Sequence, residues 1–175
     1  MSLLLPALLL SCADIDPGVF EGIEVEEAWL EEARLTSLAL VVGRVRGSAE
    51  LFVEGVDGEL VSGPVALRGG TAGFMLDVVL TEFPLGDVPL QLPREEVMGE
   101  ELLGRYRGRS ASLVSGLGVE THHLRNDAGV EIDQAFLALG VGMMLGYESL
   151  TLRPVGADSG DTGDTGFEPD TGETR

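Results

Sequence analysis

Two adjacent histidines, His122 and His123, are the only imidazoles in the chain, and Asp127, Glu131 and Asp133 follow within a few residues. Imidazole and carboxylate groups are common ligands of zinc and other transition metals. Neighbouring residues of a β-strand point to opposite faces, so two adjacent histidines in a strand do not bind one ion together. We therefore predict no metal and no cofactor, and we interpret the histidine pair as an exposed hairpin end.

The C-terminal residues repeat an Asp-Thr-Gly unit over residues 158–166 and again at 170–172. Asp at every third position is typical of calcium-binding loops, but the closing bidentate Glu and the fixed Gly of such loops are missing. With almost no apolar surface to offset the entropy of ordering, residues 156–175 are predicted to be a disordered acidic tail. The alternative is a metal-dependent hydrolase or a calcium-dependent adhesion module that uses both histidines and this tail.

Motifs for enzymatic chemistry are missing from the sequence. It contains no Gly-x-Ser-x-Gly elbow, and without any lysine it has no phosphate-binding loop of the usual type. The paired acids at 95–96 and 100–101 are typical of a solvated helical face rather than of a buried acid and base. We predict that the protein is not an enzyme.

Cys12 is the only cysteine and directly follows the apolar residues 3–11. This order is similar to the lipobox of bacterial lipoproteins, which implies a signal peptide at residues 1–11 and a diacylglycerol on the Cys12 thiol. An apolar stretch of about 10 residues is too short to cross a hydrocarbon core about 30 Å thick. Because no Lys or Arg precedes the stretch, an ordinary secretory signal is the alternative. In either case we expect export.

Charge and length limit the organisation of the chain. At 175 residues, with a formal net charge of -19, it fits one domain that does not bind nucleic acid. Residues 13–33 contain eight acids and no base, whereas residues 34–155 contain ten arginines and 16 acids. We predict an acidic spacer at 12–34, a folded domain at 35–155 and the tail at 156–175.

The central residues show strand patterns. Short β-prone runs at 38–45, 49–53, 59–68, 71–80, 109–121, 129–139 and 140–153 are separated by breaks such as Asp57-Gly58 and residues 126–129. Pro84, Pro89 and Pro93 interrupt the pattern before a helical turn or lid predicted within 94–103. The pattern favours an all-β, mainly antiparallel fold: a small closed β-barrel with a short N-terminal helix or lid. Val25, Trp29 and Ala33 suggest that helix, and a strand at 23–25 is its alternative.

Glycines gather on one face of the last strands. In residues 110–120 and 140–152, one face is filled by apolar side chains and the other is nearly without side chains. Glycine in a strand marks a bend, a bulge or close approach by another group. Curvature for barrel closure is the first interpretation, and room for a packed helix or an apolar ligand is the second. The candidate positions are Gly116, Gly118, Gly140, Gly142 and Gly146.

Only 5% of the residues are aromatic, which argues against a transmembrane barrel with aromatic girdles. We therefore expect a soluble barrel that lies beside a membrane.

Three blocks resemble a known family. Residues 62–74 are similar to the Gly-Pro-then-Gly-Phe block of a family of periplasmic envelope-integrity proteins and of the related SYLF lipid-binding domains. Residues 106–119 and 139–147 resemble the C-terminal half of that family, with its Gly-Ser-Ala, Gly-x-Gly-Val and closing Gly-Val-Gly-x-x-x-Gly-Tyr strands. The resemblance covers roughly residues 36–154.

The resemblance implies a small periplasmic β-barrel that supports the cell envelope and contacts lipid or another apolar molecule, with no catalytic residues. Ala13, after Cys12, resembles the residue choice that directs lipoproteins to the outer membrane of Gram-negative bacteria. The expected partner is therefore the membrane, reached through the lipid on Cys12, and the expected location is the periplasm or the cell surface.

Overall fold

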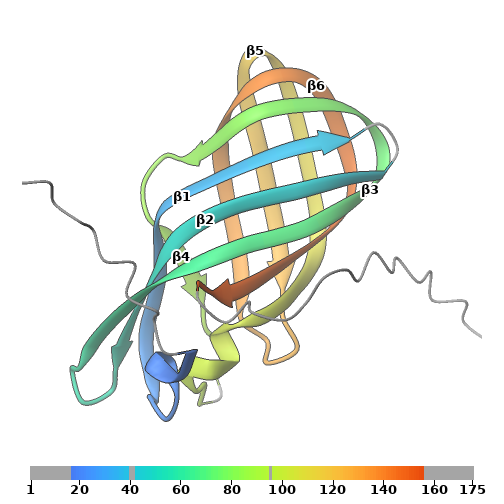
Figure 1. Cartoon of the computed structure of the whole chain (residues 1–175). Helices are drawn as coiled ribbons and strands as arrows, with labels where there is room; N and C mark the ends of the chain where they lie inside the picture. The colour runs from blue at the N-terminus through green and yellow to red at the C-terminus, as the bar shows by residue number, and fades with distance from the viewer. Residues whose placement is uncertain (1–16, 40–41, 95, 156–175) are drawn as a thin grey trace, which may run out of the picture.

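The computed structural model describes residues 17–39, 42–94 and 96–155. They form one antiparallel sheet of six strands, with two 3-10 helices beside it (Figure 1). In chain order the elements are η1 (Pro17–Phe20), β1 (Val25–Ala39), β2 (Val42–Gly55), β3 (Leu60–Pro84), β4 (Val88–Gln91), η2 (Gly99–Leu102), β5 (Gly104–Arg125) and β6 (Glu131–Pro154). The predicted all-β, mainly antiparallel class is confirmed.

Five strands close into a strand ring. β1 pairs with β2, β2 with β3, β3 with β6, β6 with β4, and β4 with β1. β5 pairs with β6 from Gly104↔Leu152 to Arg125↔Glu131. The second half of β3 also pairs with β1, beginning at Leu35↔Glu82. Because β3 meets β2 with its first half and β1 with its second, β3 must bend around the strand ring, and β6 follows it (Figure 1).

β5 reverses its direction at Gly116. The φ angle of Gly116 is +83°, a conformation that glycine adopts without steric cost. The Thr121 hydroxyl donates a hydrogen bond to the Ala111 carbonyl over 3.3 Å, which places the two halves of β5 side by side. The same approach is seen at Gly118, where an added Cβ would meet the backbone of Val114.

Residues 25–39 form strand β1, so the predicted N-terminal helix is wrong. Ala28 and Leu30 are buried at alternate positions, and the Trp29 ring stacks on its cross-strand partner Phe52 with 5.4 Å between the ring centroids. A bulge that includes Glu32, with φ of +50°, breaks the alternation before the strand resumes. Val25, Trp29 and Ala33 are four residues apart, a spacing that fits both the helical period and the strand period of two, so it did not distinguish a helix from a strand.

The breaks that the sequence predicts between strands are partly correct. Gly58, with φ of +80°, lies in the β2–β3 turn, and Asn126 closes the β5–β6 turn by accepting a hydrogen bond from the Val130 amide at 2.9 Å. The runs expected at 59–68 and 71–80 are one strand, because β3 bends without a break. The two helices have only four residues each, and no helix in the described part of the chain is long and apolar enough to cross a membrane.

Apolar side chains fill most of the inside of the strand ring. The largest fully buried ones are Phe20, Leu35, Leu51, Leu67, Leu102, Tyr106, Leu124, Met144 and Leu152. They come from nearly every element, so the core depends on residues far apart in the chain.

Tyr106 links this core to η2, which forms one turn of the predicted lid region. Its hydroxyl donates a 2.7 Å hydrogen bond to the Leu102 carbonyl, and its side chain is fully buried. Burial raises the pKa of Tyr106 far above its ordinary value of 10, and a hydrogen bond with Asn126 only partly opposes this effect.

We expect the folded protein to keep Tyr106 protonated when free tyrosine ionises. The unfolded chain releases this proton above about pH 10, so Tyr106 stabilises the fold below that pH and its contribution is lost as the pH rises further. Absorbance of tyrosinate during an alkaline titration should show a late step that coincides with unfolding and that is missing in Tyr106→Phe. A single early step from both tyrosines would contradict the prediction.

Candidate functional site

Four ionisable side chains are buried together inside the strand ring. Glu82 comes from β3, Glu120 and His122 from β5, and Glu148 from β6, and each residue is at most 3% exposed. Glu120 and His122 are two residues apart and therefore share the inward face of their strand. We call these four residues the buried cluster.

The strand pairing explains how Glu148 reaches His122. Glu148 pairs with Gly108 of the first half of β5. Because β5 turns back at Gly116, Gly108 lies against the backbone of His123 in the second half. Glu148 and His122 are therefore close in space although they are 26 residues apart in the sequence.

His122 is the centre of the cluster. Its Nδ1 lies 2.7 Å from Oε2 of Glu148, while its Nε2 lies 3.3 Å from Oε2 of Glu82 and 3.9 Å from Oε1 of Glu120. The ring of Phe136 meets the imidazole edge to face, with 4.9 Å between the centroids. The imidazole is thus held from three sides.

Burial alone would lower the pKa of His122. The negative charge of Glu148 and the hydrogen bonds to Glu148 and Glu82 outweigh burial, with a further contribution from the charge of Glu120, and the pKa of His122 is raised well above its usual value. The surrounding carboxyl groups therefore favour the imidazolium form of His122.

The cluster has an excess of acid. Three carboxyl groups surround a single imidazole. No arginine is buried within residues 17–39, 42–94 and 96–155, and the chain has no lysine. Among the described residues, Oε1 of Glu82 and Oε1 of Glu148 are buried without a hydrogen-bond partner. Such groups are costly to bury unless something else compensates them.

The outer surface carries a second feature, which we call the apolar cap. Thirteen large apolar side chains, each at least 40% exposed, point outward where β1, β2, β3, β5 and β6 bend or turn. They are Leu38, Val42, Val78, Leu80, Phe83, Leu113, Leu117, Val119, Leu139, Val141, Met143, Leu145 and Tyr147. Many are direct cross-strand partners, as in Leu38↔Val78↔Val141 and in Leu117↔Leu139.

Arginines border the apolar cap on one side. Two successive rows of paired residues cross β2, β3, β6 and β5: Arg44, Gly70, Ser149 and Arg107 in the first row, and Arg46, Arg68, Thr151 and Arg105 in the second. We call these the arginine rows; they hold five arginines and no acid. Next to the first row, the Arg109 guanidinium lies 5.9 Å from the centre of the ring of Tyr147, a residue of the apolar cap.

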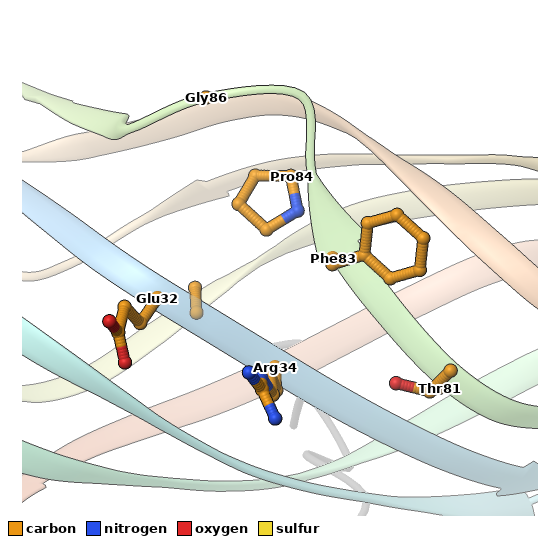
Figure 2. A pocket seen from close by; sticks show the side chains of 7 residues that line it. Glu32, Arg34, Thr81, Phe83, Pro84 and Gly86 are labelled. Atoms are coloured by element: carbon orange, nitrogen blue, oxygen red, sulfur yellow. The ribbon is translucent and has the colours of Figure 1, made fainter.

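A seam interrupts the wall of the strand ring next to the buried cluster. The pairing of β1 with β4 stops at Leu30, and its pairing with β3 begins at Leu35↔Glu82. An open depression of about 510 Å³ lies along this seam, between Glu32 and Arg34 of β1 and Phe83 and Pro84 of β3 (Figure 2). Its remaining lining residues are Ala33, Thr81 and Gly86.

In the glycine-rich parts of β5 and β6, the two faces are oriented opposite to the usual arrangement, in which the apolar face is buried. The face filled by apolar side chains points outward and forms the apolar cap, while the glycine face points inward with the polar residues. A Cβ at Gly140 or Gly146 would strike the backbone of β3, a Cβ at Gly118 would strike the backbone of the first half of β5 itself, and Gly142 pairs with Val114. With Gly116 at the reversal of β5, the candidate glycines lie where strands bend or approach closely. Their role toward an apolar ligand stays a prediction.

The two histidines do point to opposite faces. The side chain of His123 is 65% exposed, with Nδ1 at 3.5 Å from Oδ2 of Asp133. The interpretation of His122 as part of an exposed hairpin end is wrong, because β5 continues to Arg125 and its inward face is covered. Of the other acids named with this pair, Asp127 is exposed in the β5–β6 turn, and Glu131 contacts Arg125 at 3.5 Å. Cys12 and residues 156–175 lie outside the described residues.

Sequence reasoning missed Glu82, Glu120 and Glu148. The spacing of Glu120 and His122 on the glycine face of β5 was the available signal. Nothing in the sequence indicated that this face is the inner one, or that Glu82 and Glu148 approach it from other strands.

Comparisons of the chain with protein-family models, with curated proteins and with solved structures give no match. The resemblance to envelope-integrity proteins therefore stays a prediction. On the geometry, the buried cluster can hold protons or a cation, and the apolar cap with the arginine rows can contact an apolar, negatively charged surface.

Proposed function

We propose that this protein is a non-enzymatic component of a Gram-negative cell envelope. In this proposal it is a small β-barrel, tethered through a lipid on Cys12, whose apolar cap contacts the membrane directly and so supports the envelope. The observation that carries the proposal is the apolar cap itself. Contiguous apolar patches larger than a few hundred Å² are rare on monomeric proteins and mark contact with protein or membrane.

The positive charge of the arginine rows favours anionic lipid over a neutral partner for the apolar cap. Polybasic segments are attracted to anionic lipid by roughly 1 kcal/mol for each Lys or Arg near the surface. The arginine rows lie beside the cap on the same outer surface, although the whole chain has a net charge of -19. An aromatic side chain at the border, Tyr147, suits the interface between hydrocarbon and headgroups.

The depth of the cap fits one leaflet. On β5 the outward apolar positions run only from Ala111 to Val119, and the strand reverses at Gly116 between them. The half before Gly116 therefore contributes five residues, 111–115, and the half after it contributes three, 117–119, which are about 16 and 10 Å long at about 3.3 Å per residue. A strand that crosses a bilayer needs about 9–11 residues. The cap would thus insert without spanning, beside the membrane as the sequence suggested.

The cap can be tested with vesicles. The substitution Cys12→Ala removes the lipid anchor from the full-length protein. More of this variant should co-sediment with vesicles that contain about one third phosphatidylglycerol than with vesicles of phosphatidylcholine alone. Val141→Asn combined with Leu145→Asn should weaken binding about tenfold or more, because each side chain loses apolar contact with lipid.

The matched control is Val56→Asn combined with Leu60→Asn, which alters two exposed apolar residues at the β2–β3 turn, outside the cap. This control should bind like the parent. Equal binding by the cap variant, or equal loss in the control, would count against membrane contact.

The anchor is tested separately. Labelled palmitate should enter the wild-type protein in a Gram-negative host and should not enter Cys12→Ala. Absence of label from the wild type would leave an ordinary secretory signal as the explanation of residues 1–11.

A further inference from the structure

We propose that Glu82, Glu120 and His122 bind one divalent first-row transition-metal ion inside the strand ring, with Glu148 positioning the imidazole. This site does not depend on the membrane contact proposed above. It uses the buried cluster, which the apolar cap does not explain.

The donor atoms have metal-ligand spacing. One atom each from Glu82, Glu120 and His122 lies within 4.8 Å of the others. Two ligand atoms that are each about 2.0–2.1 Å from a tetrahedral ion are about 3.3 Å apart. Nε2 of His122 and Oε2 of Glu82 are 3.3 Å apart, whereas the 3.9 Å to Oε1 of Glu120 requires only a small side-chain movement.

Glu148 completes a carboxylate–histidine–metal arrangement. With Nδ1–H of His122 donating to Glu148 at 2.7 Å, the lone pair of Nε2 is left for the ion. Metal-bound histidines usually donate their other N–H to a carboxylate or carbonyl in this way, which fixes the tautomer and orientation. Without a proton or a cation at Nε2, this lone pair would face two carboxylate oxygens.

Charge also favours a cation. Three carboxyl groups face one imidazole, and a divalent ion would bring twice the positive charge of a single proton on Nε2. The ion would displace that proton from Nε2 to solvent, so binding releases a proton. The buried and unpartnered Oε1 of Glu82 could also turn toward the ion as a second oxygen ligand.

The ligand set selects the class of metal. An imidazole nitrogen with carboxylate oxygens suits zinc, iron, manganese or cobalt, whereas calcium and magnesium prefer oxygen ligands alone. Glu82 pairs with Leu35 at the end of the seam and lies in β3 between Thr81 and Phe83, two residues that line the surface depression (Figure 2).

The test uses full-length protein treated with a chelator and then titrated with Zn²⁺ by calorimetry. We expect one ion per chain, a rise in Tm, and binding at least about tenfold weaker in Glu82→Gln and in Glu120→Gln, which keep the size of the side chain but remove the charge. Glu148→Gln should weaken binding while keeping the stoichiometry. His123→Ala, which changes the exposed neighbour, should bind like the wild type.

Co²⁺ provides a second measurement that does not depend on any variant folding. Bound to wild-type protein, it should give the visible absorption of a low-coordinate nitrogen and oxygen site, and Zn²⁺ should displace it. The proposal is overturned if the wild type binds neither ion. It is also overturned if binding persists in Glu82→Gln, or if it is lost in His123→Ala.

Discussion

His122→Ala is expected to lower the free energy of unfolding by about 3–5 kcal/mol, the usual cost of removing one partner from a buried ionic group. The substitution leaves Glu148 and Glu82 without the imidazole that contacts them at 2.7 and 3.3 Å. It also leaves a cavity beside Phe136, whose ring packs on the imidazole. Urea unfolding followed by circular dichroism measures the difference.

His123→Ala is the matched control, because His123 is adjacent in sequence and its side chain is 65% exposed. We expect a change of about 0.5 kcal/mol or less there. Similar losses in both variants would show that His122 is not a buried partner of the glutamates. If His122→Ala does not fold, His122→Gln keeps part of the volume and should be intermediate.

Gly69→Ala is the second variant with a large expected effect. A Cβ on Gly69 would strike the backbone carbonyl of Ser149, and the Cα of Leu150 would lie 3.1 Å away. Backbone atoms cannot rotate away as a side chain can, so β3 and β6 would have to separate where they pair. We expect a loss of about 3 kcal/mol or more in the free energy of unfolding.

Gly70→Ala tests whether this loss comes from the close approach of the Ser149 backbone or follows from replacing any glycine of β3. Gly70 is the next residue of β3, and its added Cβ would find only the Gly43 carbonyl, at 3.3 Å. The expected loss is about 1 kcal/mol or less. Gly140→Ala should resemble Gly69→Ala, because its Cβ would strike the backbone of Val78. Equal effects at positions 69 and 70 would contradict the close approach.

Local patterns predicted the class of the fold because turns and alternation are local properties. Asp57-Gly58 and residues 126–129 mark real turns, and the alternation in β5 and β6 is correct. The helix predicted at Trp29 and Ala33 failed because residues four apart fit the helical period and the strand period of two equally well. The bulge at Glu32, which places Ala33 inside and Trp29 outside, has no mark in the sequence.

The buried cluster could not be predicted from the sequence, for a physical reason. Alternation shows that two faces differ but not which one is inside, and in residues 110–120 of β5 and 139–147 of β6 most of the large apolar side chains lie outside. Glu82, His122 and Glu148 meet only because β3, β5 and β6 bend around the same interior. Such a meeting depends on long-range register, which the sequence of one chain does not display.

The position of β6 in the chain has a consequence for biogenesis. Within the described part of the chain β6 is the last strand to be synthesised, yet it pairs with β3, β4 and β5 and supplies two of the contacts that close the strand ring. Until residue 154 has left the ribosome, the long edges of β3 and β5 lack their partner, and unpaired strand edges favour aggregation. The strand ring can therefore close only after residue 154 has been synthesised.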